Sequence, residues 1–411
     1  AAADMLGRFL SGKDDGAAGD RGRRAALWLR LGEARRERGD AKSAHAALDR
    51  AIAVAPQSEA ATAARRALVP LLAADPARRG ELCDVRGALA AATASAADVG
   101  AWADELRRAE RIDAAAVALD LAIALGATPD LHQTAFRTVH PTRAMPADES
   151  YRGSVDAEAR ARFLHDPDEA ALTPIFAALA EAAGQLWPDP DEALAKAGAR
   201  GARRIAGASS PPAMAFVRIT AALGCGPASL YVRDDAGAPD LQLVCAGTPI
   251  VVFGPRLGDA VDGHRRFALG RIAELTRPER AIVAGLADAE VATLLAALVR
   301  SFAPATSHAA VARLIADPDV QRARDEALRG ALPVRLRQRF EQLFAELPPG
   351  AIDLARHRAA VARVAERAAL LVSGDGAAAL ARPTGGPAAV VRTVAHADYL
   401  PLRARLGLAV V

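Results

Sequence analysis

Cysteine is scarce in this sequence: its 411 residues include only three, Cys83, Cys225 and Cys245. An odd number with these separations matches neither the paired spacing of a zinc-binding motif nor a redox-active dithiol. Free cysteine is among the most buried residue types, so we expect three buried free thiols. This cysteine usage fits a reducing compartment, and we therefore expect a cytoplasmic protein.

Long apolar runs are missing as well. No run of apolar residues reaches the roughly 18 residues that a transmembrane helix needs, so we expect no membrane span. No secretory signal peptide is recognisable at Ala1. The sequence begins without methionine, and whether residues precede Ala1 is left open.

Aromatic residues make up only 4% of the chain, although 52% of its residues are hydrophobic, because alanine supplies much of the apolar count. Small side chains favour close packing of helices over a large aromatic core, so we expect a mostly α fold.

The charges nearly balance, with 52 Lys and Arg against 49 Asp and Glu, and they are interspersed along the chain. We therefore expect no nucleic acid among the partners of this protein.

The clearest local pattern lies in residues 25–56, AALWLRLGEARRERGDAKSAHAALDRAIAVAP. Trp28 and Leu31 fall in a first predicted helix, Gly39 begins a turn, and Leu48 falls in a second helix. Three small residues let the two helices approach closely, namely Gly32, Ala44 and Ala51. This pattern resembles a tetratricopeptide repeat, a helix pair that must stack on neighbours to bury its apolar face.

Two weaker copies follow, at residues 58–72 and 98–129, and we expect a TPR-like helical repeat module over residues 1–130. The resemblance implies that the first helix of each repeat lines a concave groove that binds a partner. In the clearest repeat the groove residues would be Leu29, Glu33, Arg36 and Glu37. The alternative is that these four residues form an ordinary solvated helix surface.

Residues 131–160 lose the helical periodicity and contain scattered proline, glycine and acidic residues, which predicts a linker. A second, α+β domain is expected over residues 161–411. Its helical pattern is interrupted by short stretches of β-branched or aromatic residues, which predict three or four strands. These stretches are residues 215–223, 229–233, 241–245 and 249–253, and a further short strand or turn is expected at residues 390–394.

Residues 228–277 place strand, turn, strand and helix in an order that resembles the core of HExxH zinc metallopeptidases. The nearest resemblance is to gluzincins of the CAAX prenyl protease and Oma type. Residues 269–275, LGRIAEL, are similar to the LGHELGH-like helix of that family, and residues 365–371, AERAALL, are similar to its E-x-x-A-D-R-A segment. The resemblance implies a zincin-like fold with a small sheet over residues 161–411.

The residues that bind zinc in that family are replaced here. Such a site needs two histidines one helical turn apart, a glutamate base after the first histidine, and a distant glutamate. Arg271 and Leu275 stand at the histidine positions, Ile272 at the base, and Ala362 at the distant ligand. Arginine stays protonated and cannot bind a metal ion. The resemblance therefore implies a pseudo-peptidase without catalytic residues, zinc or any other cofactor.

Arg271 shares one predicted helical stripe with His264 and Ala268. An unpaired guanidinium on a buried stripe would be costly, so we expect a buried ion pair with Glu366, whose helix would face this one. The alternative is that Arg271 points to solvent, because long cationic side chains readily reach outward.

Together these patterns predict a non-catalytic scaffold or adaptor that binds another protein through its helical repeats and its pseudo-peptidase domain. One alternative is a divergent metallopeptidase with relocated ligands, for which the candidates are His264 together with His357 or Glu366. Another is a structural subunit of a larger assembly that uses alanine-rich helical surfaces. The sequence does not predict the oligomeric state.

Overall fold

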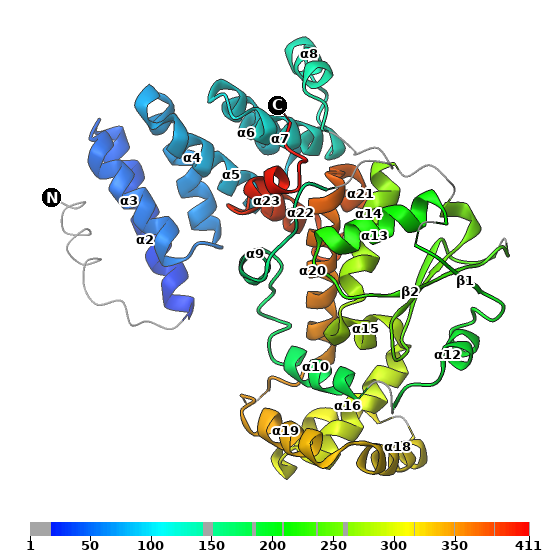
Figure 1. The fold of residues 1–411 in the computed structure, drawn as a ribbon. Helices are drawn as coiled ribbons and strands as arrows, with labels where there is room; N and C mark the ends of the chain where they lie inside the picture. The colour runs from blue at the N-terminus through cyan, green and yellow to red at the C-terminus, as the bar shows by residue number, and fades with distance from the viewer. Residues whose placement is uncertain are drawn as a thin grey trace. The chain divides into compact units, whose positions relative to one another are not determined.

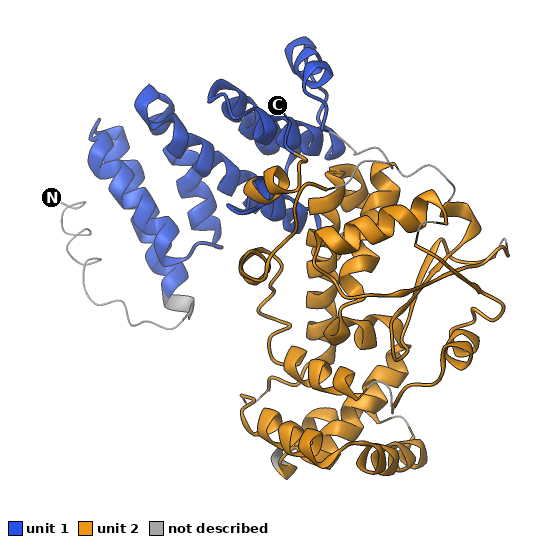
Figure 2. Ribbon diagram, viewed as in Figure 1, with its two compact units in different colours: residues 1–142, 386–400, 409–411 blue, residues 143–385, 401–408 orange. Residues whose placement is uncertain are grey.

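The structure, a computed structural model, describes residues 18–142, 151–182, 186–207, 209–235, 237–257, 262–315, 317–348, 350–381 and 383–410. These residues form 21 α-helices and one small sheet of four strands, which confirms the expected mostly α fold. The chain divides into two compact units (Figure 2). Unit 1 comprises residues 1–142, 386–400 and 409–411, and unit 2 comprises residues 143–385 and 401–408. None of the helices in the described ranges combines the length and hydrophobicity that a membrane span requires.

The units differ from the expected domain boundaries in two places. The expected linker, residues 131–160, contains the helices α8 (Leu131–Val139) and α9 (Ala157–Phe163), and its residues 143–150 lie outside the described ranges. Residues 386–400 and 409–411 belong to unit 1 and not to the second domain. Composition could not indicate this return, because a boundary where the chain comes back to an earlier unit needs no local break in sequence.

Six helices open unit 1, and each packs against the next one along the chain (Figure 1). They are α2 (Ala18–Glu37), α3 (Ala41–Val54), α4 (Glu59–Ala73), α5 (Arg79–Thr93), α6 (Ala96–Arg108) and α7 (Ile112–Ala124). Asp40, Ser58 and Ser95 cap α3, α4 and α6, because each side chain accepts a hydrogen bond from the backbone N–H three residues later. The helix pairs predicted at residues 25–56 and 98–129 are present, whereas residues 58–72 form one helix, α4, which packs on α5.

The first helix pair packs closely because of a glycine. A Cβ atom at Gly32 would lie 2.7 Å from the Leu48 side chain, which is itself fully buried. Trp28, Leu31 and Ala51 complete the same core cluster, as the repeat pattern predicts. The turn between α2 and α3 is made by Gly39, whose φ of 81° is readily adopted only by glycine.

The helix α22 (Pro387–Val394) completes unit 1 and packs against α5 and α7. The strand or turn expected at residues 390–394 is therefore wrong. Three valines favour a strand by local propensity, but Val390, Val391 and Val394 lie on one face of a helix and are all buried. Pro387 stands in the first turn of α22, where its missing N–H breaks no helical hydrogen bond.

Unit 2 contains most of the remaining helices and the sheet (Figure 1). After α9 its helices are α10 (Thr173–Glu181), α12 (Pro190–Lys196), α13 (Pro211–Ala222), α14 (Gly263–Leu275), α15 (Pro278–Gly285), α16 (Asp288–Phe302), α17 (His308–Val311), α18 (Pro318–Ala331), α19 (Val334–Ala345), α20 (Leu354–Ser373), α21 (Gly376–Ala381) and α23 (Tyr399–Arg405). Its largest apolar core is contributed mainly by α10, α15, α16, α18 and α19.

The sheet has the strand order β1-β2-β4-β3. Its strands are β1 (Arg203–Ile205), β2 (Ser229–Val232), β3 (Leu241–Val244) and β4 (Ile250–Phe253). The pair β2 and β4 is parallel and the other two pairs are antiparallel. All four residues of β4 are buried, because α12 covers the face of Ile250 and Val252 while Phe216 of α13 meets the ring of Phe253 on the other face.

Three of the four predicted strand stretches are strands, and the fourth is not. Residues 215–223 lie in α13, which begins with the capping residue Ser210 and two prolines at its first positions. These start signals favour a helix, and they outweigh the β-branched residues that suggested a strand. The edge strand β1 was not predicted, because it is only three residues long and carries two arginines.

The helices α14 and α20 pack against each other, as expected for the helices that carry Arg271 and Glu366. Gly270 makes this approach possible. A Cβ atom there would lie 2.6 Å from the Val372 side chain and 3.0 Å from the Ala369 Cα atom. Backbone lies on one side of the gap, so the neighbours have little freedom to move away.

We expect Gly270→Ala to destabilise the protein by about 1–3 kcal/mol, because overpacking outweighs the better helix propensity of alanine. Gly330→Ala is the matched control. Gly330 lies in α18, a Cβ atom there would meet no other atom within 4 Å, and the substitution should gain about 0.5–1 kcal/mol. Thermal unfolding followed by circular dichroism measures both changes. A Gly270→Ala variant as stable as Gly330→Ala would contradict this interpretation of the α14–α20 contact.

Candidate functional site

The expected degenerate zinc site falls on α14 and α20 in unit 2. Leu275 is buried, Ile272 and Ala362 are half-buried, and Arg271 is exposed. None of these four side chains can donate an electron pair to a cation at neutral pH. The positions of the zinc ligands and the base in the metallopeptidases that this sequence resembles therefore carry no metal ligand here.

The expected buried ion pair between Arg271 and Glu366 is wrong. Arg271 is exposed, and the Glu366 carboxylate accepts hydrogen bonds from the Thr384 backbone N–H at 3.1 and 3.0 Å and from the Thr384 hydroxyl. The helix pairing was predicted, but the rotation of α14 was not. Charged residues occur all around α14, so hydrophobic periodicity could not show which side is buried.

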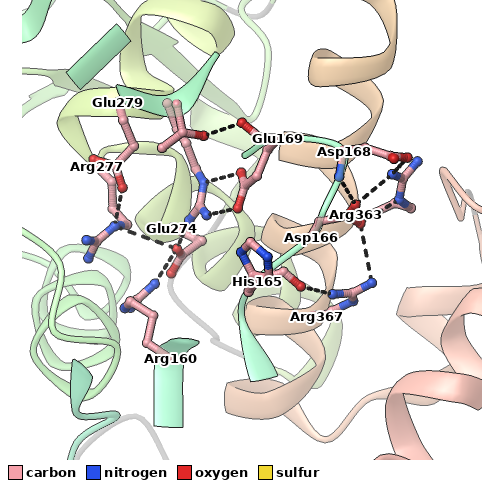
Figure 3. A network of polar contacts seen from close by, with 12 residues as sticks. Arg160, His165, Asp166, Asp168, Glu169, Glu274, Arg277, Glu279, Arg363 and Arg367 are labelled. Atoms are coloured by element: carbon pink, nitrogen blue, oxygen red, sulfur yellow. Dashed lines mark hydrogen bonds and ion pairs between the residues drawn. The ribbon is translucent and has the colours of Figure 1, made fainter. Parts of the chain in front are cut away.

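The buried side of α14 carries Glu274, which is completely shielded from solvent and lies at the centre of a charge network (Figure 3). Arg160 of α9 donates to Glu274 with an N–O distance of 2.5 Å, and Arg280 of α15 donates to the same oxygen. Arg280 also makes a bidentate pair with Glu169, with N–O distances of 2.7 and 3.2 Å. Two carboxylates and two guanidiniums therefore neutralise one another inside unit 2.

A second branch of the network fixes the loop between α9 and α10 to α20 (Figure 3). Arg363 donates to both oxygens of Asp166, at 2.9 and 3.0 Å, and to Asp168 at 2.9 Å. Arg367 donates to the His165 carbonyl at 2.7 Å. Burial alone would raise the pKa of the Asp166 carboxyl, but hydrogen bonding and charge from Arg363, with further charge from Arg367, hold it below its ordinary value.

This arrangement suits structural support better than acid–base chemistry. The carboxylates of Glu274, Glu169 and Asp166 are each held by guanidinium groups. The one thiol beside them is Cys225, whose Sγ lies 3.7 Å from a Glu274 oxygen. Burial raises the pKa of Cys225 to about 12, and the Glu274 charge adds to that effect, so the thiol is not ionised at neutral pH. All three cysteines are free, as expected, and Cys225 is half-buried.

One group of possible metal ligands occurs within the described ranges, and it lies in unit 1. His45 contacts Asp49 through Nδ1 at 3.0 Å and Glu81 through Nε2 at 2.8 Å. The Arg78 guanidinium lies between them, 2.5 Å from His45 Nε2 and 2.6 Å from a Glu81 oxygen. The Arg78 guanidinium therefore already contacts two of the three groups, the His45 imidazole and the Glu81 carboxylate. The relocated-ligand candidates lie elsewhere: His264 is exposed, and His357 is buried in α20 and stacks on Phe176.

Unit 1 also contains a pocket of about 640 Å³, formed by α4, α5, α6, α7, α22 and the residues that follow α3 and α22. Small residues leave this space open, and they are Gly87, Ala88, Ala91, Ala92 and Ala114. Trp102 and Leu106 of α6 form buried parts of the lining. A Cβ atom at Gly87 would lie 3.1 Å from the Trp102 indole, so the glycine lets this ring lie directly against α5. The volume is within the range of ligand-binding pockets.

Charged groups surround the alanine-lined surface of the pocket. They are Arg65, Asp84, Arg111, Arg392 and the ionisable His396. Arg65 donates to the Pro56 carbonyl at 3.1 Å, and burial lowers the pKa of its guanidinium, which still leaves it charged at neutral pH. The sequence does contain one signal for this pocket, the stretch GALAAA at residues 87–92, which is rich in glycine and alanine, but similar stretches occur throughout the chain.

The predicted groove residues of α2 do not line this pocket. Leu29 is half-buried and packs against the core cluster of the first helices, and Glu33 is half-buried. Arg36 and Glu37 are exposed in the last turn of α2. Their role in binding stays a prediction.

Comparison with known protein families, curated proteins and solved structures found no match for this chain.

Neutralising Glu274 should destabilise unit 2 strongly. Glu274→Gln removes the carboxylate that pairs with both Arg160 and Arg280, of which Arg280 keeps its pair with Glu169, and breaking a buried pair in this way costs about 3–5 kcal/mol. Asp319→Asn is the surface control, because both side chains of the Asp319–Arg322 pair are largely exposed and its loss should cost less than about 1 kcal/mol. Chemical unfolding measures both values. Equal stability losses would show that the buried network contributes no more than a surface pair.

His357 should make stability depend on pH in mildly acidic solution. Burial lowers the pKa of His357 to about 4 from an ordinary 6.5, and nearby Arg280 and Arg358 also disfavour its charged form. Between these values the unfolded chain binds a proton that the folded chain does not, so stability falls as the pH falls from about 6.5 to 4. His357→Phe should flatten this part of the stability curve, measured by denaturant unfolding at several pH values. The exposed His132→Phe should leave the slope unchanged.

Proposed function

We propose that this chain is a non-catalytic scaffold that binds a segment of a partner protein through the helical unit 1. The observation that carries the proposal is the pocket of about 640 Å³ lined by α4, α5, α6, α7 and α22. Side chains are small on its inner surface and charged around it, which is the composition that binds a mixed apolar and polar ligand. Tetratricopeptide-like helix pairs, which the sequence of residues 25–56 resembles, commonly present such surfaces to other proteins.

For unit 2 we propose a pseudo-peptidase, a zincin-like domain without its catalytic groups. Support comes from the packing of α14 on α20 and from the residues at the four ligand and base positions. The buried charges of unit 2 are also occupied with one another, Glu274 and Glu169 with Arg280 in particular. Groups held in mutual pairs stabilise a fold and are poorly placed to activate water.

Filling the pocket should abolish binding. The test selects random dodecapeptides displayed on phage against the immobilised full-length chain. Recovery of the peptides enriched on the wild type should fall about tenfold or more on the variant Ala92→Phe. Ala92 lines the pocket and is exposed enough to accept a larger side chain. Ala46→Phe is the matched control, since Ala46 is exposed on α3 outside the pocket.

Two outcomes contradict the proposed function. Equal recovery of peptides on Ala92→Phe and wild type, or no enrichment on either, would remove the pocket as a protein-binding site. Stoichiometric zinc in the purified chain together with peptidase activity would replace the scaffold by the divergent metallopeptidase.

A further inference from the structure

The pocket of unit 1 carries an excess of positive charge. Three guanidinium groups line it, those of Arg65, Arg111 and Arg392, against the single carboxylate of Asp84. Asp84 lies 3.7 Å from Arg111, and its side chain is 79% exposed, so this pair is loose and solvated. Solvent-screened pairs of this kind are weak, and the Arg111 guanidinium keeps hydrogen-bonding capacity for a ligand.

The same surface already binds one segment of the chain. The helix α22 places Val390, Val391 and Val394 against α5 and α7, and Val394 also lines the pocket. The pocket is therefore the uncovered continuation of a surface that accepts a short amphipathic segment. A second segment lying beside α22 would find an alanine-lined floor of the same kind.

The charges decide what kind of segment fits. From the three guanidiniums and the alanine floor we infer that the pocket binds an acidic peptide segment of the partner protein, with its carboxylates paired to Arg65, Arg111 and Arg392. Guanidinium groups pair with carboxylates through two parallel hydrogen bonds, which gives orientation as well as charge complementarity. An apolar side chain of the same segment lies on Ala88 and Ala92. This inference rests on the proposed function and adds the chemical class of the partner.

A nucleic acid fits this pocket poorly. Single-stranded nucleic acids bind by stacking bases on exposed aromatic rings, and besides the small imidazole of His396 the lining offers one ring, that of Trp102, which is 6% exposed. The charges of the whole chain also nearly balance, at a net +3. Neither property provides the extended positive surface that a phosphate backbone requires.

The experiment uses fluorescence anisotropy with three libraries of fluorescein-labelled octapeptides and the full-length chain. The libraries share Leu and Ala and differ in their polar residues, which are Asp and Glu in the first, Asn and Gln in the second, and Lys in the third. The acidic library should bind most tightly, and added NaCl should weaken its binding because exposed charge pairs are screened. Arg392→Glu should weaken it roughly tenfold, since reversal of one charge replaces an attraction with a repulsion.

The control variant is Arg50→Glu, which reverses an exposed charge on α3 outside the pocket and should leave binding unchanged. Arg392→Glu should also bind the lysine library more tightly than the wild type does. A gain of this kind cannot arise from misfolding, so it separates a change of specificity from a damaged protein.

The outcomes distinguish this inference from the proposed function. If the amide library binds as tightly as the acidic one and Ala92→Phe abolishes both, the pocket is a protein-binding site but its acidic preference is wrong. If free glutamate competes as well as the octapeptides do, the ligand is a small acid and not a peptide. If no library binds in a way that Ala92→Phe abolishes, the proposed function fails together with the inference.

Discussion

The close approach of helices through glycine is the constraint on which both units depend. Gly32 lets α2 approach the Leu48 side chain of α3, and Gly270 lets α14 approach the Ala369 backbone of α20. A chain with few aromatic residues has few large side chains with which to bury apolar surface. Its helices must therefore pack closely to bury enough of it. The same small residues have a second effect. Where the facing helix does not fill the space, as beside Ala88 and Ala92, a pocket remains.

The buried charges of unit 2 are a second constraint. Glu274 is completely buried, so its charge is tolerable only because Arg160 and Arg280 are brought to it from α9 and α15. Glu169 then neutralises the remaining charge of Arg280. The network thereby connects elements that lie far apart in the sequence. Its charged groups could take part in catalysis only if these pairs were broken.

Much of the fold could be predicted from local patterns. The buried face of α14 and the packing of α22 in unit 1 could not. Trp28, Gly32 and Leu48 lie as the repeat pattern predicts, because helix packing within a pair depends on residues a few turns apart. The strands β2, β3 and β4 were indicated by their β-branched residues. The buried face of α14 could not be predicted, because it carries two charged residues, Arg266 and Glu274. Glu274 is stabilised there by Arg160, which lies more than a hundred residues away in the sequence. The pocket could not be predicted either, because Arg392 joins Arg65 and Arg111 only when α22 packs on α5.

Residues near the end of the sequence complete unit 1. Residues 386–400 follow almost all of unit 2 in the sequence, yet they supply α22 and one side of the pocket in unit 1. Each of the helices α2 to α7 contacts the next one along the chain, and α5 and α7 also contact α22. The complete pocket exists only after α22 has been synthesised and packed on α5 and α7. A binding site built in this way is present only in chains that extend beyond unit 2, so unit 1 alone would offer a different surface from the one in the whole protein.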